Sequence, residues 1–303
     1  MPIPDYQTVM LPLLKITADQ KSHRLDEVVE KISDEFKLSD AERSQLLPSG
    51  VTQIINDRVG WARTYLKQAG LIQYPQRGFS AITSRGQEVL KSDLPRIDVK
   101  FLMNFPEFVE FRNRTQKNDG VSALTDSNSN NLTPQEAMES AFERIQSALA
   151  QDLLQKTKSA SPQFFERLVV DLLLAMGYGG SLKEAGKVIG KSGDGGIDGV
   201  INEDKLGLDT IYIQAKRWQS VVGRPEIQKF VGALQGVRAR KGVFITTSNF
   251  TSDAKNYTTN LDTKIVLVDG EMLSDLMIEH NVGVSVQRRL DVKRIDEDYF
   301  LEE

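Results

Sequence analysis

A run of small polar residues near the middle of the chain is the feature that most limits how it can fold. Between residues 116 and 134 the sequence consists largely of Gly, Ser, Asn and Asp. Such a composition forms no packed core and is typical of a linker. The 303 residues therefore divide into two folded parts, in keeping with a usual domain size of about 150 residues. We expect a first domain over residues 1–95, a linker and bridging helix over 96–160, and a second domain over 161–303.

The first domain has the pattern of helices followed by a hairpin. Apolar residues recur at helical spacing in four segments, and two short apolar runs then flank a turn. The expected helices are 5–16, 23–36, a short one from 38–40, 51–68 and 85–90, and the expected strands are 71–74 and 79–83. This order predicts a winged helix-turn-helix.

Charge distribution indicates a basic face on this domain. The whole chain has a net charge of −4. Residues 1–57 carry six Lys/Arg and ten Asp/Glu, whereas residues 58–100 carry eight Lys/Arg and three Asp/Glu. In a winged helix the third helix enters the major groove and the basic tip of the wing meets phosphate. The residues that we expect to contact DNA are Arg58, Arg63, Lys67, Arg77 and Arg85. The alternative is a solvated helix face on a protein-interaction domain, since a fold does not fix a function.

Composition excludes several classes of site. The chain has no cysteine and two histidines, His23 and His280. It therefore cannot form disulfides, cysteine-ligated zinc sites or multi-histidine metal sites, and a Ser-His-Asp triad is disfavoured. No secretory signal or apolar run of membrane-spanning length is evident, so we expect a cytoplasmic protein without a membrane partner.

A long helix is expected to join the two domains. Thr133 is a suitable N-cap, Pro134 suits the first helical turn, and Glu136 completes a capping box. Apolar residues four apart continue the helix to about residue 156.

The second domain reads as alternating helices and strands. The expected helices are 161–176, 225–237, 251–260 and 270–280, and the expected strands are 196–201, 210–216, 242–247 and 264–268. This order predicts an α/β fold whose central mixed sheet is flanked by helices on both faces.

Four polar residues of this domain are candidates for catalysis. Asp198 follows the glycine-rich run 193–196, and Gln214 and Lys216 are two apart in the next expected strand. Residues two apart on a strand share one face. If the two strands are neighbours, these side chains converge at the sheet edge, and Glu166 on the first helix is placed to reach the same point.

This set suits metal-dependent hydrolysis of a phosphodiester bond. A hard cation such as Mg²⁺, or Mn²⁺ in its place, prefers oxygen ligands, which Asp198, the Gln214 amide and the carbonyl of Ala215 offer. The cation polarises the scissile phosphate and activates water. Lys216 orients that water or offsets charge on phosphate oxygens, and Glu166 binds a water on the metal or a second ion. Taken singly, each residue also has a structural explanation, such as a turn for Asp198 or a surface ion pair for Glu166.

These residues resemble a known family. Asp198 with Gln214-Ala215-Lys216 looks like the PD-(D/E)XK nuclease motif with Gln in place of the second acid. The similarity to the Mrr restriction endonucleases extends over residues 60–62, 66–70, 193–201, 214–218, 223–226 and 242–248. The resemblance implies a modification-dependent, type IV restriction enzyme that acts on methylated double-stranded DNA. Its winged helix would recognise DNA and its PD-(D/E)XK domain would cleave it. Gln214 leaves one less negative charge to hold the metal, a variant usual for Mrr-like proteins.

Two other functions are considered. Residues 185–192 fit a relaxed phosphate-binding loop, but the glycine-rich run behind them cannot supply the helix that such a loop requires, so we expect no nucleotide cofactor. The second alternative is a catalytically inactive DNA-binding regulator or repair accessory with a nuclease-like fold, against which the retained Asp198, Gln214 and Lys216 speak. Because one site cuts one strand, a double-strand break implies a homodimer or higher homo-oligomer.

Overall fold

The fold comprises two compact units. The computed structural model describes residues 2–92, 94–116, 131–179, 196–204, 206–259, 261–293 and 295. One unit contains residues 1–144 together with 294–303, and the other contains residues 145–293. Over the described ranges, every helix is too short or too polar to span a bilayer. Residues 185–192, the alternative nucleotide site, lie outside the described residues, as do residues 117–130 of the expected linker.

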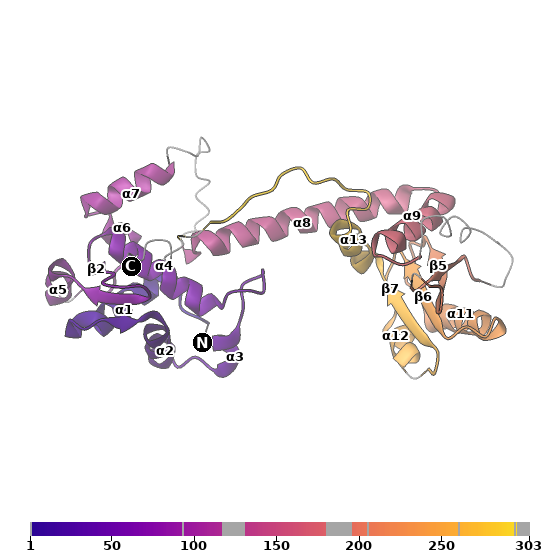
Figure 1. The fold of residues 1–303 in the computed structure, drawn as a ribbon, viewed down its shortest axis with the longest axis horizontal. Coiled ribbons are helices and arrows are strands. Elements are labelled where there is room, and N and C mark those ends of the chain that lie inside the picture. The colour runs from indigo at the N-terminus through magenta and orange to yellow at the C-terminus, as the bar shows by residue number, and fades with distance from the viewer. Residues whose placement is uncertain are drawn as a thin grey trace. The chain divides into compact units, whose positions relative to one another are not determined.

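The N-terminal unit is built on a helical core and a small antiparallel sheet. Its first elements are α1 (Tyr6–Ile16), β1 (His23–Arg24), α2 (Leu25–Glu35), α3 (Asp40–Ser44), α4 (Ile54–Gln68), β2 (Ile72–Gln73), β3 (Phe79–Ile82) and α5 (Ser84–Lys91). The strands lie in the order β1-β3-β2. Apolar side chains at helical spacing on α1, α2 and α4, among them Val9, Ile32 and Leu66, are fully buried between the helices. This arrangement is a winged helix-turn-helix (Figure 1).

Strand β1 departs from the sequence-based expectation. We expected residues 23–36 to form one helix, but His23 and Arg24 pair with Ser80 and Phe79 of β3. Arg24 is the extended N-cap of α2. The prediction was wrong here because a strand of two residues has no periodicity of its own and is defined by its partner. Helix α4 likewise begins at Ile54, three residues later than expected.

The N-terminal unit extends beyond residue 95. Helices α6 (Val99–Leu102) and α7 (Pro106–Gln116) follow α5. Ile97, Leu102 and Phe108 are fully buried in the same core as α1 and α4. The Phe108 ring lies 5.4 Å from that of Tyr65 on α4. These helices thus complete the core of the unit. We had expected the linker to begin at residue 96, so the first unit is longer than predicted.

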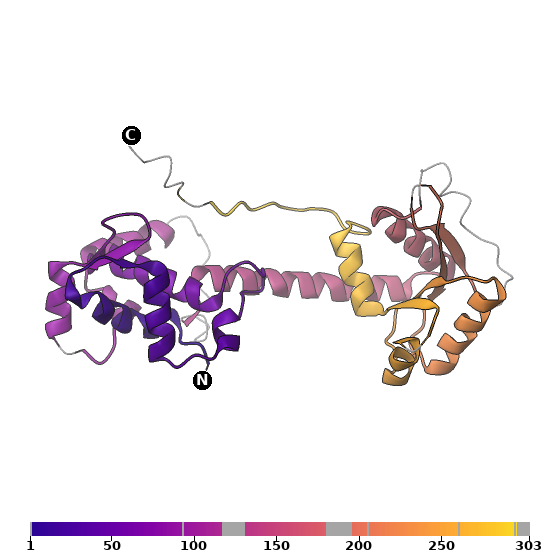
Figure 2. The same ribbon diagram turned by 60° about the horizontal axis from the view of Figure 1, so that its bottom comes forward.

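Helix α8 (Pro134–Ser159) begins with the predicted capping box. The Thr133 N–H donates to Glu136 Oε2 at 2.8 Å, and the Glu136 N–H donates to Thr133 Oγ1 at 3.0 Å. These two bonds satisfy orphan donors at the helix start. The prediction is confirmed, and α8 runs without interruption for 26 residues (Figure 2).

The C-terminal unit is a four-stranded mixed sheet covered on both faces. Its elements are α9 (Pro162–Ala175), β4 (Gly199–Asn202), β5 (Thr210–Lys216), α11 (Arg224–Gly236), β6 (Lys241–Thr246), α12 (Ser252–Thr259), β7 (Lys264–Val268) and α13 (Gly270–Glu279). The strand order is β4-β5-β6-β7. Strand β4 is antiparallel to β5, and the other pairs are parallel. Helices α9 and α13 pack on one face and α11 and α12 on the other (Figure 1).

Candidate active site

Asp198 and Lys216 meet at the edge of the sheet where β4 begins. Asp198 lies one residue before β4, not within it as expected. Its backbone N–H donates to the carbonyl of Ile213 at 2.8 Å. Its Oδ2 accepts from the N–H of Ala215 at 2.9 Å and from Lys216 Nζ at 3.1 Å. The backbone of β5 therefore fixes the carboxylate, and the lysine lies directly beside it.

Both charges are only partly covered. The Asp198 side chain is 20% exposed and that of Lys216 is 28% exposed. Both side chains are therefore reached by solvent. Lys216 Nζ is 3.4 Å from Asp198 Oδ1, which is longer than its contact to Oδ2, so Oδ1 is the less engaged of the two carboxylate oxygens.

Gln214 lies two residues before Lys216 on β5 and therefore on the same face of the sheet. Its side chain is only 6% exposed, yet Oε1 accepts no hydrogen bond from any described residue. Gly196, with φ +123°, packs so closely that an added Cβ would lie 3.0 Å from Gln214 Nε2. A buried amide oxygen without a donor is costly unless a further group binds it.

Oxygen atoms at this edge fit a hard divalent cation. They are the carboxylate of Asp198, the orphaned Oε1 of Gln214 and the carbonyl of Ala215. The N–H and C=O of one strand residue point to the same side, and the N–H of Ala215 is bonded to Asp198, so its carbonyl faces that side too. Within the described part of the chain, no group of three His, Cys, Asp or Glu side chains can hold a metal. The amide and the carbonyl thus take the place of further carboxylates.

Glu166 is not brought to this point by any described contact. It lies on the exposed side of α9, next to Phe165, which is buried. Among the described residues, none forms a hydrogen bond or ion pair with Glu166. Helix α9 was correctly predicted from the sequence. The spacing of its apolar residues does not specify the distance between Glu166 and the strands.

Two of the five basic residues expected to contact DNA are engaged inside the N-terminal unit. Arg58 Nε donates to Glu136 Oε1 at 2.8 Å and Nη1 donates to the carbonyl of Ile3 at 2.6 Å. Arg63 is 8% exposed, bonds to Ser80 Oγ, and stacks on the ring of Tyr74 at 4.1 Å. These two arginines hold α4 against its neighbours, so neither is presented to a duplex.

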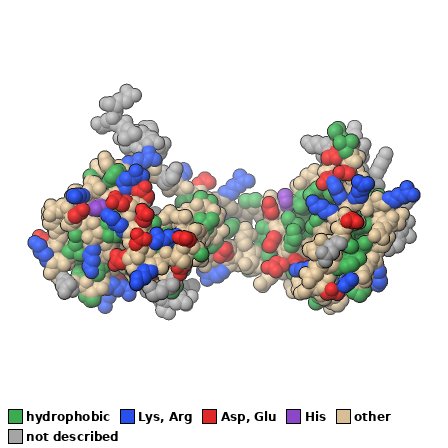
Figure 3. Space-filling view, turned by 90° about the horizontal axis from the view of Figure 1, so that it is seen from below, with side chains coloured by type: hydrophobic (Ala, Val, Ile, Leu, Met, Phe, Trp, Pro, Cys, Tyr) green, Lys and Arg blue, Asp and Glu red, His purple; other side chains and the backbone are tan. Residues whose placement is uncertain are grey.

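The other three basic residues are more accessible. Arg85 donates to the carbonyl of Ala69 and to Glu107, both at 3.0 Å, and is partly exposed. Lys67 is exposed on α4, with Nζ 4.4 Å from the centre of the Tyr74 ring. Arg77 is exposed in the turn between β2 and β3. On the face drawn in Figure 3, acidic and basic side chains are interspersed over the N-terminal unit.

Burial raises the pKa of a carboxyl group on α4 that packs against the start of α8. Asp57 is 7% exposed and accepts a hydrogen bond from Thr133 Oγ1. Desolvation by burial raises the pKa of Asp57, and the bond from Thr133 opposes this increase. Asp57 thus belongs to the packing between α4 and α8 and has no place in the catalytic constellation.

Comparisons with known proteins cover both units. A family model described as "Restriction endonuclease" matches residues 157–277, and one described as "Mrr N-terminal domain" matches residues 6–92. The chain is 38% identical over 313 residues to the "Type IV methyl-directed restriction enzyme EcoKMrr" of Escherichia coli K12, covering 99% of this chain and 100% of that protein. A solved structure of the MspJI restriction endonuclease with a 27-mer oligonucleotide matches with a TM-score of 0.33 and 22% identity, over 54% of this chain and 36% of that one.

Proposed function

The chain belongs to the Mrr family of restriction endonucleases, and on that premise we propose that it hydrolyses methylated double-stranded DNA at the edge formed by Asp198, Gln214 and Lys216. The observation that carries this assignment is the contact of 3.1 Å between Asp198 Oδ2 and Lys216 Nζ, on the strand face that also carries Gln214, whose Oε1 accepts no hydrogen bond from a described residue. A partly exposed carboxylate and ammonium group, with a buried amide oxygen on the same strand face, match the requirements of phosphodiester hydrolysis.

The divalent cation typical of this family would be held by Asp198, Gln214 Oε1 and the Ala215 carbonyl, and we propose that it is Mg²⁺, with Mn²⁺ as a substitute. When bound, it supplies Lewis-acid polarisation of the phosphate and a lower pKa for water. Asp198 is oriented for this role by the Ala215 N–H, which holds Oδ2. Lys216 donates protons in hydrogen bonds that orient the attacking water or offset charge on the phosphate oxygens.

Glu166 remains a prediction from the sequence, as the additional acid that binds water or a second ion. The exposed position of Glu166 on α9 leaves it accessible to DNA or solvent. The change Glu166→Gln should reduce cleavage if the prediction holds, and unchanged cleavage removes the residue from the site.

The test of the proposed nuclease activity is nicking of supercoiled plasmid. Wild-type protein should nick methylated plasmid with Mg²⁺ and leave it intact in EDTA. Asp198→Asn should abolish nicking while retaining DNA binding, because the change keeps the shape of the side chain and removes its charge. Asp262→Asn, at an exposed aspartate, is the matched control. Binding without any cleavage by the wild type in Mg²⁺ or Mn²⁺ would instead support the inactive DNA-binding regulator.

A double-strand break requires a second active site, and we propose that a second copy of this chain supplies it. On α8, Met138, Phe142, Ile145 and Leu149 follow one another at spacings of four, three and four residues, with exposed fractions from 38% to 66%. This is the spacing of a helix-pairing seam. Of the flanking residues, Ala141, Gln146 and Ala148 are uncharged, and Glu139 is bonded to Ser49 of its own chain, which limits like-charge repulsion when the seam faces its own copy.

A further inference from the structure

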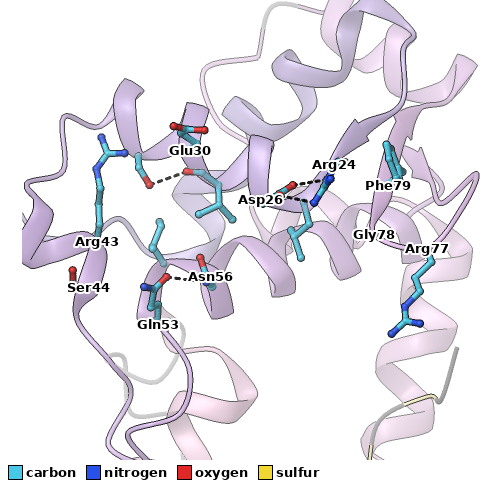
Figure 4. Close-up of a pocket in the computed structure, with 14 residues that line it drawn as sticks. Arg24, Asp26, Glu30, Arg43, Ser44, Gln53, Asn56, Arg77, Gly78 and Phe79 are labelled. Carbon is cyan, nitrogen blue, oxygen red and sulfur yellow. Dashed lines mark hydrogen bonds and ion pairs between the residues drawn. The ribbon is translucent and has the colours of Figure 1, made fainter. Parts of the chain in front are cut away.

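A cavity of about 780 Å³ lies in the N-terminal unit, between α2, the start of α4 and the turn that joins β2 to β3. Figure 4 shows side chains from these separate segments around it. The polar residues that matter here are Arg24, Arg43, Gln53, Asn56 and Arg77. Of these, only Arg77 was among the residues that the sequence analysis selected for DNA binding.

Two amide side chains lie on the α4 wall of the cavity. Asn56 Nδ2 donates to Gln53 Oε1 at 2.9 Å. Asn56 is exposed, and within the described part of the chain no other side-chain hydrogen bond engages either amide. This bond leaves the Asn56 carbonyl as an acceptor and the Gln53 NH₂ as a donor, next to each other. Paired donors and acceptors of this kind are how Asn and Gln recognise the edge of a base.

Charge on the walls favours bases over phosphates inside the cavity. Arg24 is bonded to Asp26 at 3.1 and 2.8 Å, so its charge is largely offset. Glu30 adds a second carboxylate to the same side. Carboxylates repel phosphate but accept hydrogen bonds from exocyclic amino groups of bases. The interior therefore suits base edges and not the DNA backbone.

Arg77, at the margin of the cavity, can contact the phosphates of the DNA backbone. Arg77 is exposed in the turn between β2 and β3 and extends away from the amides in Figure 4. Contacts of arginine with phosphate position a protein on the duplex without reading sequence. Arg43 is bonded to Asp34 at 2.7 Å and to the carbonyl of Leu38 at 3.0 Å, which fixes it as part of the wall.

Apolar side chains complete the lining. Leu25 and Val29 of α2 border the cavity and are partly buried, and Ile55 beneath them is 1% exposed. A base methyl group gains favourable contact from such a surface. The cavity thus combines amides that can recognise a base edge with an apolar surface that can receive a methyl group.

We propose that this cavity is where the protein reads the methylated base, with Gln53 and Asn56 on the base edge, Leu25 and Val29 on the methyl group, and Arg77 on the adjacent phosphate. This inference rests on the proposed function, since it takes methylated DNA as the substrate. It concerns recognition only and involves no residue of the nuclease site.

Binding in EDTA tests the inference separately from cleavage. The probes are DNA fragments of one sequence made with 5-methylcytosine throughout, with N6-methyladenine throughout, or with neither. The full-length wild-type chain should prefer one methylated fragment. In the variant with both Gln53→Ala and Asn56→Ala, affinity for that fragment should fall roughly 10- to 100-fold, with affinity for the unmethylated fragment unchanged within about twofold.

Arg77→Ala should behave differently from the amide variant. It should weaken binding to methylated and unmethylated fragments alike. In a plot of the logarithm of the binding constant against the logarithm of salt concentration, the magnitude of the slope should fall by about one. Matched controls are Gln87→Ala on α5 and Lys15→Ala at the end of α1, neither of which lines the cavity. Thermal unfolding of every variant verifies that it is folded.

The outcomes separate the two proposals. A wild-type protein that binds all three fragments equally contradicts the proposed substrate and this inference together. If the wild type prefers methylated DNA and the amide variant keeps that preference in full, the cavity is not the reading site, although the proposed function stands.

Discussion

The change Lys216→Ala should greatly reduce the rate of cleavage and have little effect on the free energy of unfolding. The Asp198–Lys216 pair is closed at 3.1 Å, with side chains 20% and 28% exposed. The Coulomb attraction at that distance is about 1 to 5 kcal/mol for an effective dielectric constant between 80 and 20. Desolvation and side-chain ordering offset most of it, so Lys216→Ala should lower the free energy of unfolding by only about 1 kcal/mol.

The effect on the reaction should be far larger. A domain that starts with about 5 to 15 kcal/mol of stability and loses about 1 kcal/mol stays ~99% folded or better. Loss of one preorganised donor at developing negative charge commonly costs about 100- to 1,000-fold in rate. Partial unfolding cannot account for a loss of that size, so the rate reports on the role of Lys216 itself.

The assay is single-turnover nicking of methylated plasmid with protein in excess, together with chemical denaturation of each variant. Lys229→Ala is the matched control, because Lys229 is an exposed lysine paired with Glu226 at 2.7 Å on α11. It should cut at the wild-type rate. Nicking by Lys216→Ala within about threefold of wild type would show that the ammonium has no part in the reaction.

Three other changes probe separate features. Gly196→Ala should reduce nicking and cost about 1 to 3 kcal/mol of stability, measured by denaturation, because φ is +123° and the new Cβ would lie 3.0 Å from the Gln214 amide. Ile145→Glu should weaken self-association at least about tenfold in sedimentation, since it places a charge in the apolar seam of α8; an unchanged association constant would exclude that seam. Burial raises the pKa of Asp57, so its ionised form destabilises the native state. Asp57→Asn should therefore be the more stable protein at pH 7.5, by a margin that narrows as pH falls through the native-state pKa. A margin that widens toward low pH would contradict this sign.

The candidate nuclease site follows from sequence more fully than the DNA-recognition surface does. Gln214 and Lys216 share a face because strand alternation is a local property, and Asp198 meets Lys216 because β4 and β5 are consecutive and antiparallel. Glu166 could be assigned to a helix, but the position of that helix relative to the sheet depends on packing. No contact among the described residues therefore links Glu166 to Asp198 or Lys216, and its role stays a prediction.

Arg58 and Arg63 show why the recognition surface required coordinates. Their helix was correctly expected, and basic residues on a third helix suggest DNA contacts. Whether these two arginines are free to meet a duplex is decided by their contacts with Glu136, Ser80 and Tyr74, residues that are distant in sequence. Gln53 and Asn56 carry no sequence signal of their own, because amide side chains are common at the start of a helix and on its surface.

The sequence by itself determined the two-unit organisation, the α/β class of the second unit, the capping box of α8 and the shared face of Gln214 and Lys216. Each depends on local composition or on the fixed periods of helix and strand. Only the tertiary structure decided that Asp198 contacts Lys216, that Gln214 Oε1 accepts no hydrogen bond from a described residue, and that α2, α4 and the turn after β2 border an open cavity. These depend on long-range packing, which brings together segments whose contacts no local pattern specifies.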